Sequence, residues 1–542
     1  MNCKDIYGSY VQAVIEWMVY MRKRYLLPVF ALVLILSGCT GDNQEVKQPV
    51  AEQEPDAGEV TAAPEEITAV PKQEEQQAED AIMLKLDSTV KYQILESFGT
   101  SGAWWSQYVG GWDNEYKDTG RSVREEIAKL LFDKEEGIGL TCYRYNVGAG
   151  SVNGEGEYWD YYRRTQSFET APFTYDWNKD ANAVWFMKEA VRLGVEEVIF
   201  FCNSPLERLT INGRAQLTKG TGENILPENY DDFARYVMDV AEHFIEEGVP
   251  VKFISPINEP QWEWAGGQEG CHYEPSKIAG VYRAFFEELQ SRATMAGVEL
   301  SGPESGEWGG RATEYVSALL NDTVLGEHIT AIDNHSYWSD TASKTAFKRW
   351  MDARYPEVKL RMSEWCEMVN GSDVTMDSAF HLAEVVAEDL TVLNVVSWQT
   401  WVGIAPGGYR DGLIYVNQQK KLFNPLKRLW GYGNYTKFIR PGYQRIDVSG
   451  QKDALQELKP VAFTGINEEG REELVLVVIN EAGEKQVALD IIDEVEYNRI
   501  DMFETSEEND LTSVANGEYK TGNVITIGEG SITTIILSKA GD

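Results

Sequence analysis

From about residue 90 to residue 432, short apolar runs alternate with longer stretches whose apolar residues recur at helical spacing. One example is the run VKFISPINEP (251–260), which follows the amphipathic stretch YDDFARYVMDVAEHFIEEG (230–248). A succession of eight such strand-then-helix units predicts an α/β fold, a (β/α)8 TIM barrel. The eight apolar runs occupy residues 94–105, 140–150, 195–205, 251–260, 298–308, 329–338, 358–368 and 392–403.

A doubly wound open sheet is the alternative for such an alternation. That fold usually carries a glycine-rich phosphate-binding turn after its first strand. The first run here continues as SFGTSGAWW (97–105), with bulky tryptophans where that turn needs small residues. The pattern therefore favours the barrel.

Beyond residue 432 the pattern changes to short β-branched runs that are separated by Gly, Asn and Glu turns. This pattern predicts an associated C-terminal β-sandwich domain over residues 433–542. The strand-like stretch at 81–95 precedes the barrel, and we expect it to join the sandwich. The catalytic barrel is then expected over residues 96–432.

The N-terminus has a third pattern. Three cationic residues (22–24) precede an apolar run that ends in LSGC (36–39), which is typical of a secretory signal rather than of a spanning helix. The LSGC ending resembles a bacterial lipobox, so Cys39 is expected to become the lipidated first residue of the mature protein. Residues 1–39 are accordingly predicted to be a lipoprotein signal peptide, with Met21 as a possible true start.

The stretch that follows, residues 40–80, holds 12 acidic and 2 basic side chains and almost no bulky apolar ones. Such a segment buries too little surface to offset the entropy lost on ordering, so we expect a disordered acidic linker. The protein is then expected at the extracellular face of the bacterial cell membrane, held there by its lipid anchor alone, or secreted.

The formal net charge of −38 disfavours nucleic acid and anionic membrane surfaces as partners. Four cysteines lie in the expected folded body, without a CxxC pair, and the five histidines are scattered. We therefore expect no metal site and no cofactor. Disulfides and buried free thiols remain equally open for these cysteines. They are Cys142, Cys202, Cys271 and Cys366.

Polar and aromatic side chains stand where the apolar runs end, and in a barrel these ends share one mouth. Two of them are carboxylates, Glu259 and Glu364. Aromatic rings stack on sugars, and two carboxyl groups about 5 Å apart serve as nucleophile and acid/base in retaining glycoside hydrolysis. The other groups are Trp104, Trp105, Arg144, Asn146, Asn203, Asn258, His335, Tyr337, Trp365, Trp398 and Trp401.

At these positions the sequence resembles glycoside hydrolase family 30, which belongs to a large clan of retaining glycosidases whose barrels carry their two glutamates on strands four and seven. The resemblance covers the chain from about residue 82 to its C-terminus. The matching stretches are FGTSGAWW, YRYNVGAG, FFCNSP, SPINEPQWEW, HSYW, MSEW, SWQTW and GYGNYTKFIRPGYQRI.

The resemblance implies a role for each matching residue. It makes Glu259 the acid/base and Glu364 the nucleophile. Asn258 would hold the hydroxyl next to the reacting carbon, and Arg144 and Tyr337 would position Glu364. The supporting set is completed by His335 as a hydrogen-bonded wall, Asn203, Trp398 as a sugar subsite, and Trp104 and Trp105 as either subsite or barrel-mouth core. Glu263, Glu304 and Glu307 are also expected near the mouth, without separate roles.

Within the family, FGTSGAWW together with NSP (203–205), and YRDGLIYV (409–416), are most similar to the endo-β-1,6-galactanase branch. An endo-xylanase or glucuronoxylanase is the alternative. Members that grip a glucuronate branch need a cationic clamp, and the acidic body offers no obvious one apart from isolated residues such as Arg410. The stretch LERL (206–209) departs from the family's pattern and leaves the sugar open.

A different class is a non-catalytic, sugar-binding surface lipoprotein. Such a protein would keep the tryptophans and could lose either glutamate, whereas both glutamates are present. The expected partner is a polysaccharide or oligosaccharide, and the protein is expected to be a monomer.

Overall fold

The computed structural model describes residues 81–153, 161–217, 220 and 222–539, which belong to one compact unit. The predicted signal peptide (1–39), including Cys39, and the predicted linker (40–80) lie outside these residues. Within the described ranges, no helix is both long and apolar enough to cross a membrane.

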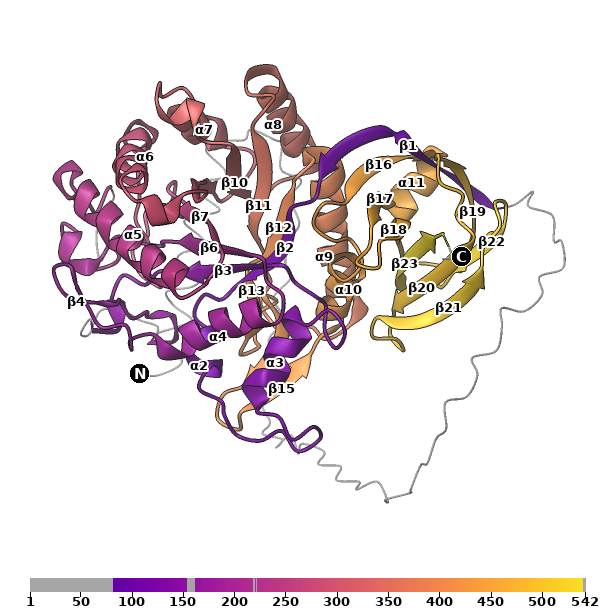
Figure 1. Cartoon of the computed structure of the whole chain (residues 1–542), viewed down its shortest axis with the longest axis horizontal. Helices are drawn as coiled ribbons and strands as arrows, with labels where there is room; N and C mark the ends of the chain where they lie inside the picture. Colours follow the sequence, from indigo (N-terminus) through magenta and orange to yellow (C-terminus); the bar gives the residue numbers. More distant parts are fainter. Residues whose placement is uncertain (1–80, 154–160, 218–219, 221, 540–542) are drawn as a thin grey trace, which may run out of the picture. The chain divides into compact units, whose positions relative to one another are not determined.

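A barrel of parallel strands surrounded by helices holds the residues of the eight apolar runs (Figure 1). The hydrogen-bonding order is β8-β7-β6-β3-β2-β12-β11-β10-β9, and every neighbouring pair is parallel. Because β8 and β9 are two pieces of the fifth strand, the ends of the sheet meet. The strands are β2 (Ser97–Ser101), β3 (Cys142–Asn146), β6 (Glu197–Phe201), β7 (Val251–Ser255), β8 (Glu299–Leu300), β9 (Pro303–Ser305), β10 (Ala331–His335), β11 (Lys359–Trp365) and β12 (Ser397–Thr400).

The helices between these strands bury one apolar stripe each. In α5 (Tyr230–Glu246), Phe233, Val237, Val240 and Phe244 follow the helical period and are almost fully buried. The prediction of an α/β barrel is confirmed. The other helices are α2 (Ser106–Val109), α3 (Val123–Phe132), α4 (Ala181–Arg192), α6 (Pro275–Gln290), α7 (Ala312–Leu320), α8 (Thr341–Arg354), α9 (Met376–Glu388) and α10 (Lys427–Thr436).

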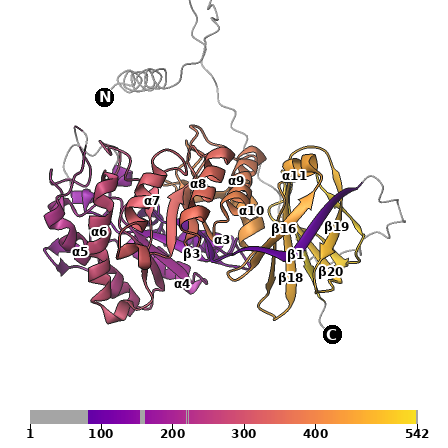
Figure 2. The same cartoon turned by 90° about the horizontal axis from the view of Figure 1, so that it is seen from above.

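A second sheet of nine strands forms the β domain (Figure 2). Its order is β21-β20-β23-β18-β17-β16-β1-β19-β22, and β1 pairs antiparallel with β16 and parallel with β19. The strands are β1 (Ile82–Ile94), β16 (Gln444–Gly450), β17 (Val461–Ile466), β18 (Glu472–Asn480), β19 (Lys485–Ile492), β20 (Arg499–Thr505), β21 (Thr512–Glu518), β22 (Val524–Ile527) and β23 (Ser531–Ser538), with α11 (Lys452–Leu458) after β16.

The two faces of this sheet serve two cores. Along β18, Leu474 and Leu476 enter a core of the β domain's own, whereas Val475 and Val477 belong to the main core shared with the barrel. The first of these cores also receives Leu84 from β1 and Ile525 from β22, so the sheet curls over it. The predicted sandwich is supported in part, because all nine strands belong to one continuous sheet.

The transition from barrel to β domain lies slightly later than the sequence pattern indicates. Helix α10 runs to Thr436, so the expected boundary between 432 and 433 falls inside it, and the next strand begins at Gln444. Asn434 of this helix donates from Nδ2 to Oγ1 of Thr534 (2.9 Å), and the Thr534 hydroxyl donates to the Asn434 carbonyl (2.7 Å). Two reciprocal hydrogen bonds thus join the helix to β23.

Candidate active site

The two strand-end glutamates converge at the mouth of the barrel. Glu259 follows β7, and Glu364 is the penultimate residue of β11. One carboxylate oxygen of each lies within 4.8 Å of the other, and the two residues keep only 8% and 4% of their surface exposed. This separation matches the geometry of a retaining pair of carboxylates.

The backbone at Glu259 is held in an unusual conformation. Its φ of +44° lies in the left-handed region that non-glycine residues rarely adopt. The Glu259 amide donates to the carbonyl of Glu304 (2.9 Å), and the indole Nε1 of Trp264 donates to the Glu259 carbonyl (3.0 Å). These two bonds fix the direction in which the Glu259 side chain leaves the strand.

Arg144, in the middle of β3, connects three of the mouth residues while fully buried itself. Its Nη1 donates to Glu364 (2.8 Å) and its Nη2 to the side-chain carbonyl of Asn258 (2.9 Å). The same Nη2 lies 3.2 Å from Glu304. One guanidinium therefore sets the position of both Glu364 and Asn258.

A chain of amides continues from Asn258. Its Nδ2 donates to Oδ1 of Asn203 (3.1 Å), and Nδ2 of Asn203 reaches Oδ1 of Asn146 at 3.4 Å. The structure thus brings Asn203 and Asn146 together behind Asn258. Asn203, which follows β6, bonds Asn258 directly, and Asn146 of β3 supports Asn203 in turn.

Tyr337 contacts Glu364 from the loop after β10. Its hydroxyl donates to Oε1 of Glu364 (3.2 Å). Burial raises the pKa of Tyr337 well above its ordinary value, and the charge of Glu364 acts in the same direction. The hydroxyl consequently keeps its proton and remains a hydrogen-bond donor.

His335 lies among three carboxylates. Its Nδ1 is 3.2 Å from Glu259 and 3.7 Å from Glu364, and its Nε2 is 3.0 Å from Glu304. Burial alone would lower the pKa of His335, but the three carboxylates raise it to about 10. The imidazole is therefore a cation at neutral pH, which is more than the wall residue expected from the sequence.

Glu304 is the main residue that sequence reasoning left without a role. It is fully buried, accepts a hydrogen bond from Ser363, and has a φ of +57°. Burial would raise its pKa, but Arg144 and His335 lower the pKa to about 2. The available signal was its place in the second half of the fifth run (298–308), which corresponds to that of Glu259 near the end of the fourth (251–260).

Neighbouring charges act on the pKa of Glu364 in opposite directions. Burial raises its pKa, and Glu259 and Glu304 add to the rise, whereas His335 and Arg144 oppose it. The two cations limit this rise in the pKa of Glu364 and favour its ionised form.

Gly306 allows the close approach of groups around Glu259. A Cβ at this position would lie 2.8 Å from Oε1 of Glu259, 2.7 Å from Nε2 of Gln261 and 3.2 Å from Nε1 of Trp262. The three groups therefore surround the space next to the Gly306 Cα. A residue larger than glycine at position 306 would displace the Glu259 carboxylate or the Gln261 amide.

Trp104 lies at the edge of the mouth. Its ring meets that of Trp401 edge to face, with centroids 5.1 Å apart, and the Arg163 guanidinium lies 4.8 Å from its centroid. Trp104 is 7% exposed and adopts a φ of +62°. It remains a candidate sugar contact beside Trp401.

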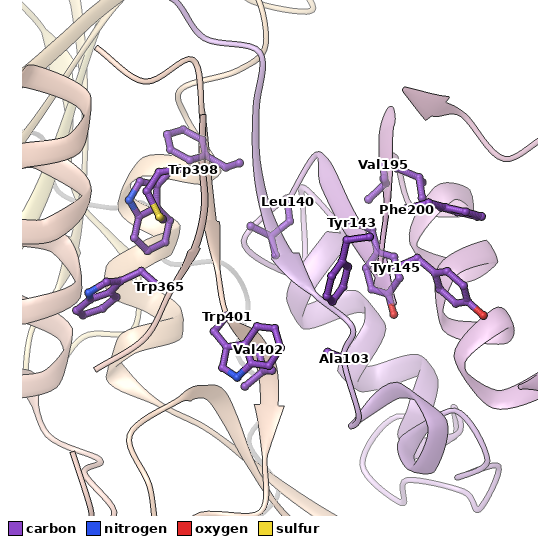
Figure 3. Close-up of a cluster of buried hydrophobic side chains, with 14 of the residues drawn as sticks. Ala103, Leu140, Tyr143, Tyr145, Val195, Phe200, Trp365, Trp398, Trp401 and Val402 are labelled. Carbon is purple, nitrogen blue, oxygen red and sulfur yellow. The ribbon is translucent and has the colours of Figure 1, made fainter. Parts of the chain in front are cut away.

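Trp105 and Trp398 are core residues. For Trp105 this is one of the two alternatives that the sequence left open, whereas for Trp398 it corrects the expected sugar subsite. Trp105 is 1% exposed, packs edge to face on Phe186, and donates from Nε1 to the Ser101 carbonyl. Trp398 has no exposed surface and belongs to the buried cluster of Figure 3, where it donates from Nε1 to Asp389 (2.9 Å). Neither ring offers a face to a sugar.

Glu259, His335 and Glu364 each offer an atom within 4.8 Å of the others, a spacing that metal ligands share. Both nitrogens of His335 already face carboxylates, and a protonated ring has no lone pair for a metal. The arrangement therefore suits an internal ion cluster. The four cysteines of the folded body are buried and form no disulfide within the described residues.

Residues 81–415 match the profile of O-glycosyl hydrolase family 30. An endo-β-1,6-galactanase of Hypocrea rufa is 24% identical over 405 residues, which cover 68% of this chain and 77% of that protein.

Two solved structures share the fold. A conserved exported protein from Bacteroides fragilis superimposes with a TM-score of 0.73 at 24% identity, over 84% of this chain and all of the other. The catalytic domain of a family 30 xylanase C from Talaromyces cellulolyticus gives a TM-score of 0.65 at 17% identity, over the same shares. Because the family profile covers more than half of the chain, the chain belongs to O-glycosyl hydrolase family 30 and is a glycoside hydrolase.

Proposed function

We propose that the protein is a retaining endo-β-1,6-galactanase that works by double displacement on two glutamates. The observation that carries the mechanism is the convergence of Glu259 and Glu364 within 4.8 Å, with Arg144 bound to Glu364. A pair this close leaves no room for the water that an inverting enzyme activates between sugar and base.

In the first step, Glu364 attacks the anomeric carbon while Glu259 gives its proton to the leaving glycosidic oxygen. The glycosidic bond breaks, and an ester between the sugar and Glu364 forms. In the second step, Glu259, now ionised, takes a proton from water, whose oxygen attacks the same carbon and releases Glu364. Asn258, held by Arg144 and Asn203, bonds the adjacent hydroxyl of the sugar.

His335 supports both steps by charge. As a cation 3.2 Å from Glu259 and 3.7 Å from Glu364, it stabilises whichever of the two carboxylates is ionised. The negative charge moves from Glu364 to Glu259 during the first step, so a cation that contacts both carboxylates stabilises the start and the end of the transfer.

The substrate is proposed from the relative that acts on β-1,6-galactan, with which the chain shares 24% identity over 68% of its length. A xylan is the competing substrate, given the fold shared with a xylanase. One observation argues against a glucuronate-bearing xylan. Arg410, the cation considered for a glucuronate clamp, is bound by Glu367 (3.0 Å) and Asp373 (3.1 Å).

We further propose that the protein is a monomer at the extracellular face of a bacterial cell membrane, held there through a lipid on Cys39, or secreted. The support is the n-region, apolar run and LSGC ending of the sequence. Labelling cells with a clickable palmitate tests this, since Cys39→Ser should abolish incorporation and release the protein into the medium.

Product analysis tests the catalytic proposal. The purified protein is incubated with debranched β-1,6-galactan and, in a separate reaction, with glucuronoxylan. Methanol is added to both reactions as an acceptor that competes with water. Short β-1,6-galacto-oligosaccharides, and methyl glycosides of β configuration in the first minutes, are expected. Xylan products would overturn the substrate and α-methyl glycosides the mechanism, while tight binding without products would support a sugar-binding protein instead.

Glu364→Gln serves as the matched test of the nucleophile. It removes the charge but keeps the size of the side chain, so it should bind the polymer, remain folded and show no turnover. Activity like that of the wild type in a folded variant would refute the assignment.

A further inference from the structure

Two tryptophans lie exposed beside the acid/base. Trp338 is 62% exposed and Trp262 is 37% exposed, and the other tryptophans of the described residues are buried or half-buried. Their rings meet edge to face, with centroids 5.4 Å apart and an interplanar angle of 79°. Exposed indoles of this size usually mark a binding surface.

The two rings come from the two loops that carry the catalytic machinery. Trp262 lies three residues after Glu259, and its amide donates to the Glu259 carbonyl (3.2 Å). Its indole Nε1 and the Glu259 carboxylate border the same point at Gly306. Trp338 directly follows Tyr337, the residue that bonds Glu364.

An unsatisfied amide lies beside them. Both polar atoms of the Gln261 side chain are buried and have no hydrogen-bond partner, and Nε2 borders the same point at Gly306 as Oε1 of Glu259. A buried amide without a protein partner costs stability, so a sugar hydroxyl that reaches this point would gain a hydrogen bond from it.

We propose that Trp262 and Trp338, with the amide of Gln261, form the subsite for the leaving-group portion of the polysaccharide, where a neutral pyranose ring stacks on the indoles. This inference rests on the proposed function, because the side of the cleft follows from Glu259 as acid. A proton donor must face the oxygen of the departing sugar, so rings next to its carboxylate contact that sugar and not the one bound to Glu364.

A strained backbone supports a binding role for Trp338. Its φ is +48°, a conformation that costs free energy for a non-glycine residue, and its ring is mostly in solvent. Because the ring is mostly exposed in the free protein, its burial does not offset this strain energy. The strain instead turns an indole outward beside the cleft, where a sugar covers it.

The test compares two leaving groups on the same enzyme. The variants Trp262→Ala, Trp338→Ala and Trp338→Phe are assayed on debranched β-1,6-galactan, glucuronoxylan and β-1,6-glucan. They are also assayed on the β-glycosyl fluorides of the matching disaccharides, whose leaving fluoride has no ring to stack. Ile466→Ala, at a 65% exposed position of the β domain, is the control.

We expect kcat/KM on the polymer to fall about tenfold in each alanine variant, as for the loss of one aromatic contact. Hydrolysis of the fluoride should stay within about threefold of wild type, because its leaving group never touches the subsite. Trp338→Phe should retain most of its activity on the polymer. In both alanine variants, a smaller share of the glycosyl-enzyme should be transferred to an added oligosaccharide rather than to water.

Two results would overturn the subsite. Equal losses on polymer and fluoride would mean that the tryptophans act through Glu259 rather than on the sugar, and unchanged rates on both would mean that they contact no substrate. If the wild type cleaves xylan or β-1,6-glucan instead of galactan, the proposed substrate fails, while the polymer-to-fluoride comparison on the cleaved polymer still decides the subsite.

Discussion

His335 and Glu304 form a buried pair, with Nε2 of the imidazole 3.0 Å from a carboxylate oxygen and no exposed surface on either side chain. The other nitrogen of the same ring faces the two glutamates proposed to carry out catalysis. Glu304 thus acts on them through His335, and its influence is measurable at the imidazole.

Replacing Glu304 by Gln should lower the pKa of His335 below its value of about 10, because one of the three carboxylates that raise it loses its charge. Nitrogen-detected NMR of the imidazole groups follows this titration directly. The alkaline limb of the pH–rate profile should move to lower pH as His335 loses its proton earlier.

Glu307→Gln is the matched control for this change. Glu307 lies three residues further along and is half-buried, and it makes no ion pair with His335. An unchanged imidazole titration in Glu304→Gln, or an equal shift in Glu307→Gln, would contradict the proposed coupling.

The same histidine makes stability depend on pH. Its folded-state pKa of about 10 lies above the ordinary value of 6.5, so its contribution is complete below about pH 6.5. The contribution is lost progressively as the pH rises to about 10, and it amounts to a few kcal/mol. Urea denaturation of wild type and His335→Gln at pH 6, 8 and 9.5 checks this.

The difference between the two proteins is the useful quantity, because the high net negative charge destabilises both as the pH rises. That difference should shrink steadily towards pH 10. A constant difference across the three pH values would show that His335 is not charged in the folded protein.

Sequence periodicity was enough to predict the barrel and to locate its chemistry. Strand ends in a parallel barrel share one mouth, so the polar residues that end the runs, such as Arg144, Glu259 and Glu364, could be grouped without coordinates. Their hydrogen bonds required the structure, since Arg144 reaches residues 114 and 220 positions away along the chain.

The tryptophans were harder to predict, because a strand-end ring points either into the mouth or towards the helices, and one residue of register decides which. Trp398 pairs in register with Phe98, and both rings pack on Tyr432 of α10, outside the strands. Glu304 could not be told from a solvated loop charge, because its partners come from β3 and β10.

Glu259→Ala should reduce hydrolysis of the polymer by about a thousandfold, as expected for loss of a general acid. Substrates with a good leaving group still form the glycosyl-enzyme, and added azide should then release it as a β-glycosyl azide, because the alanine leaves space for the anion. Chromatography of the products detects the azide adduct.

Glu263→Ala provides the comparison on the same loop. Its carboxylate accepts a hydrogen bond from the amide of Gly222 (2.8 Å), away from the ion cluster. It should hydrolyse the polymer at nearly the wild-type rate and yield no azide adduct. Azide rescue of Glu263→Ala, or its absence in Glu259→Ala, would assign the acid/base elsewhere.

Trp398→Phe separates a core tryptophan from a sugar-binding one. The change keeps the aromatic packing on Tyr432 but removes the donor to Asp389, which has no exposed surface and also binds Ser336 and Lys344. Leaving a buried acceptor with one donor fewer costs about 2 kcal/mol. The unfolding free energy should fall by that amount while KM for the polymer stays unchanged.

Trp262→Phe, at an exposed position, should show the reverse. Its unfolding free energy should remain within about 0.5 kcal/mol of wild type, since the ring is not part of the core. Its KM for the polymer should rise, because the smaller ring covers less of the sugar. A raised KM with unchanged stability in Trp398→Phe would instead indicate that Trp398 contacts the sugar. The ring would then have to leave the core when the polymer binds.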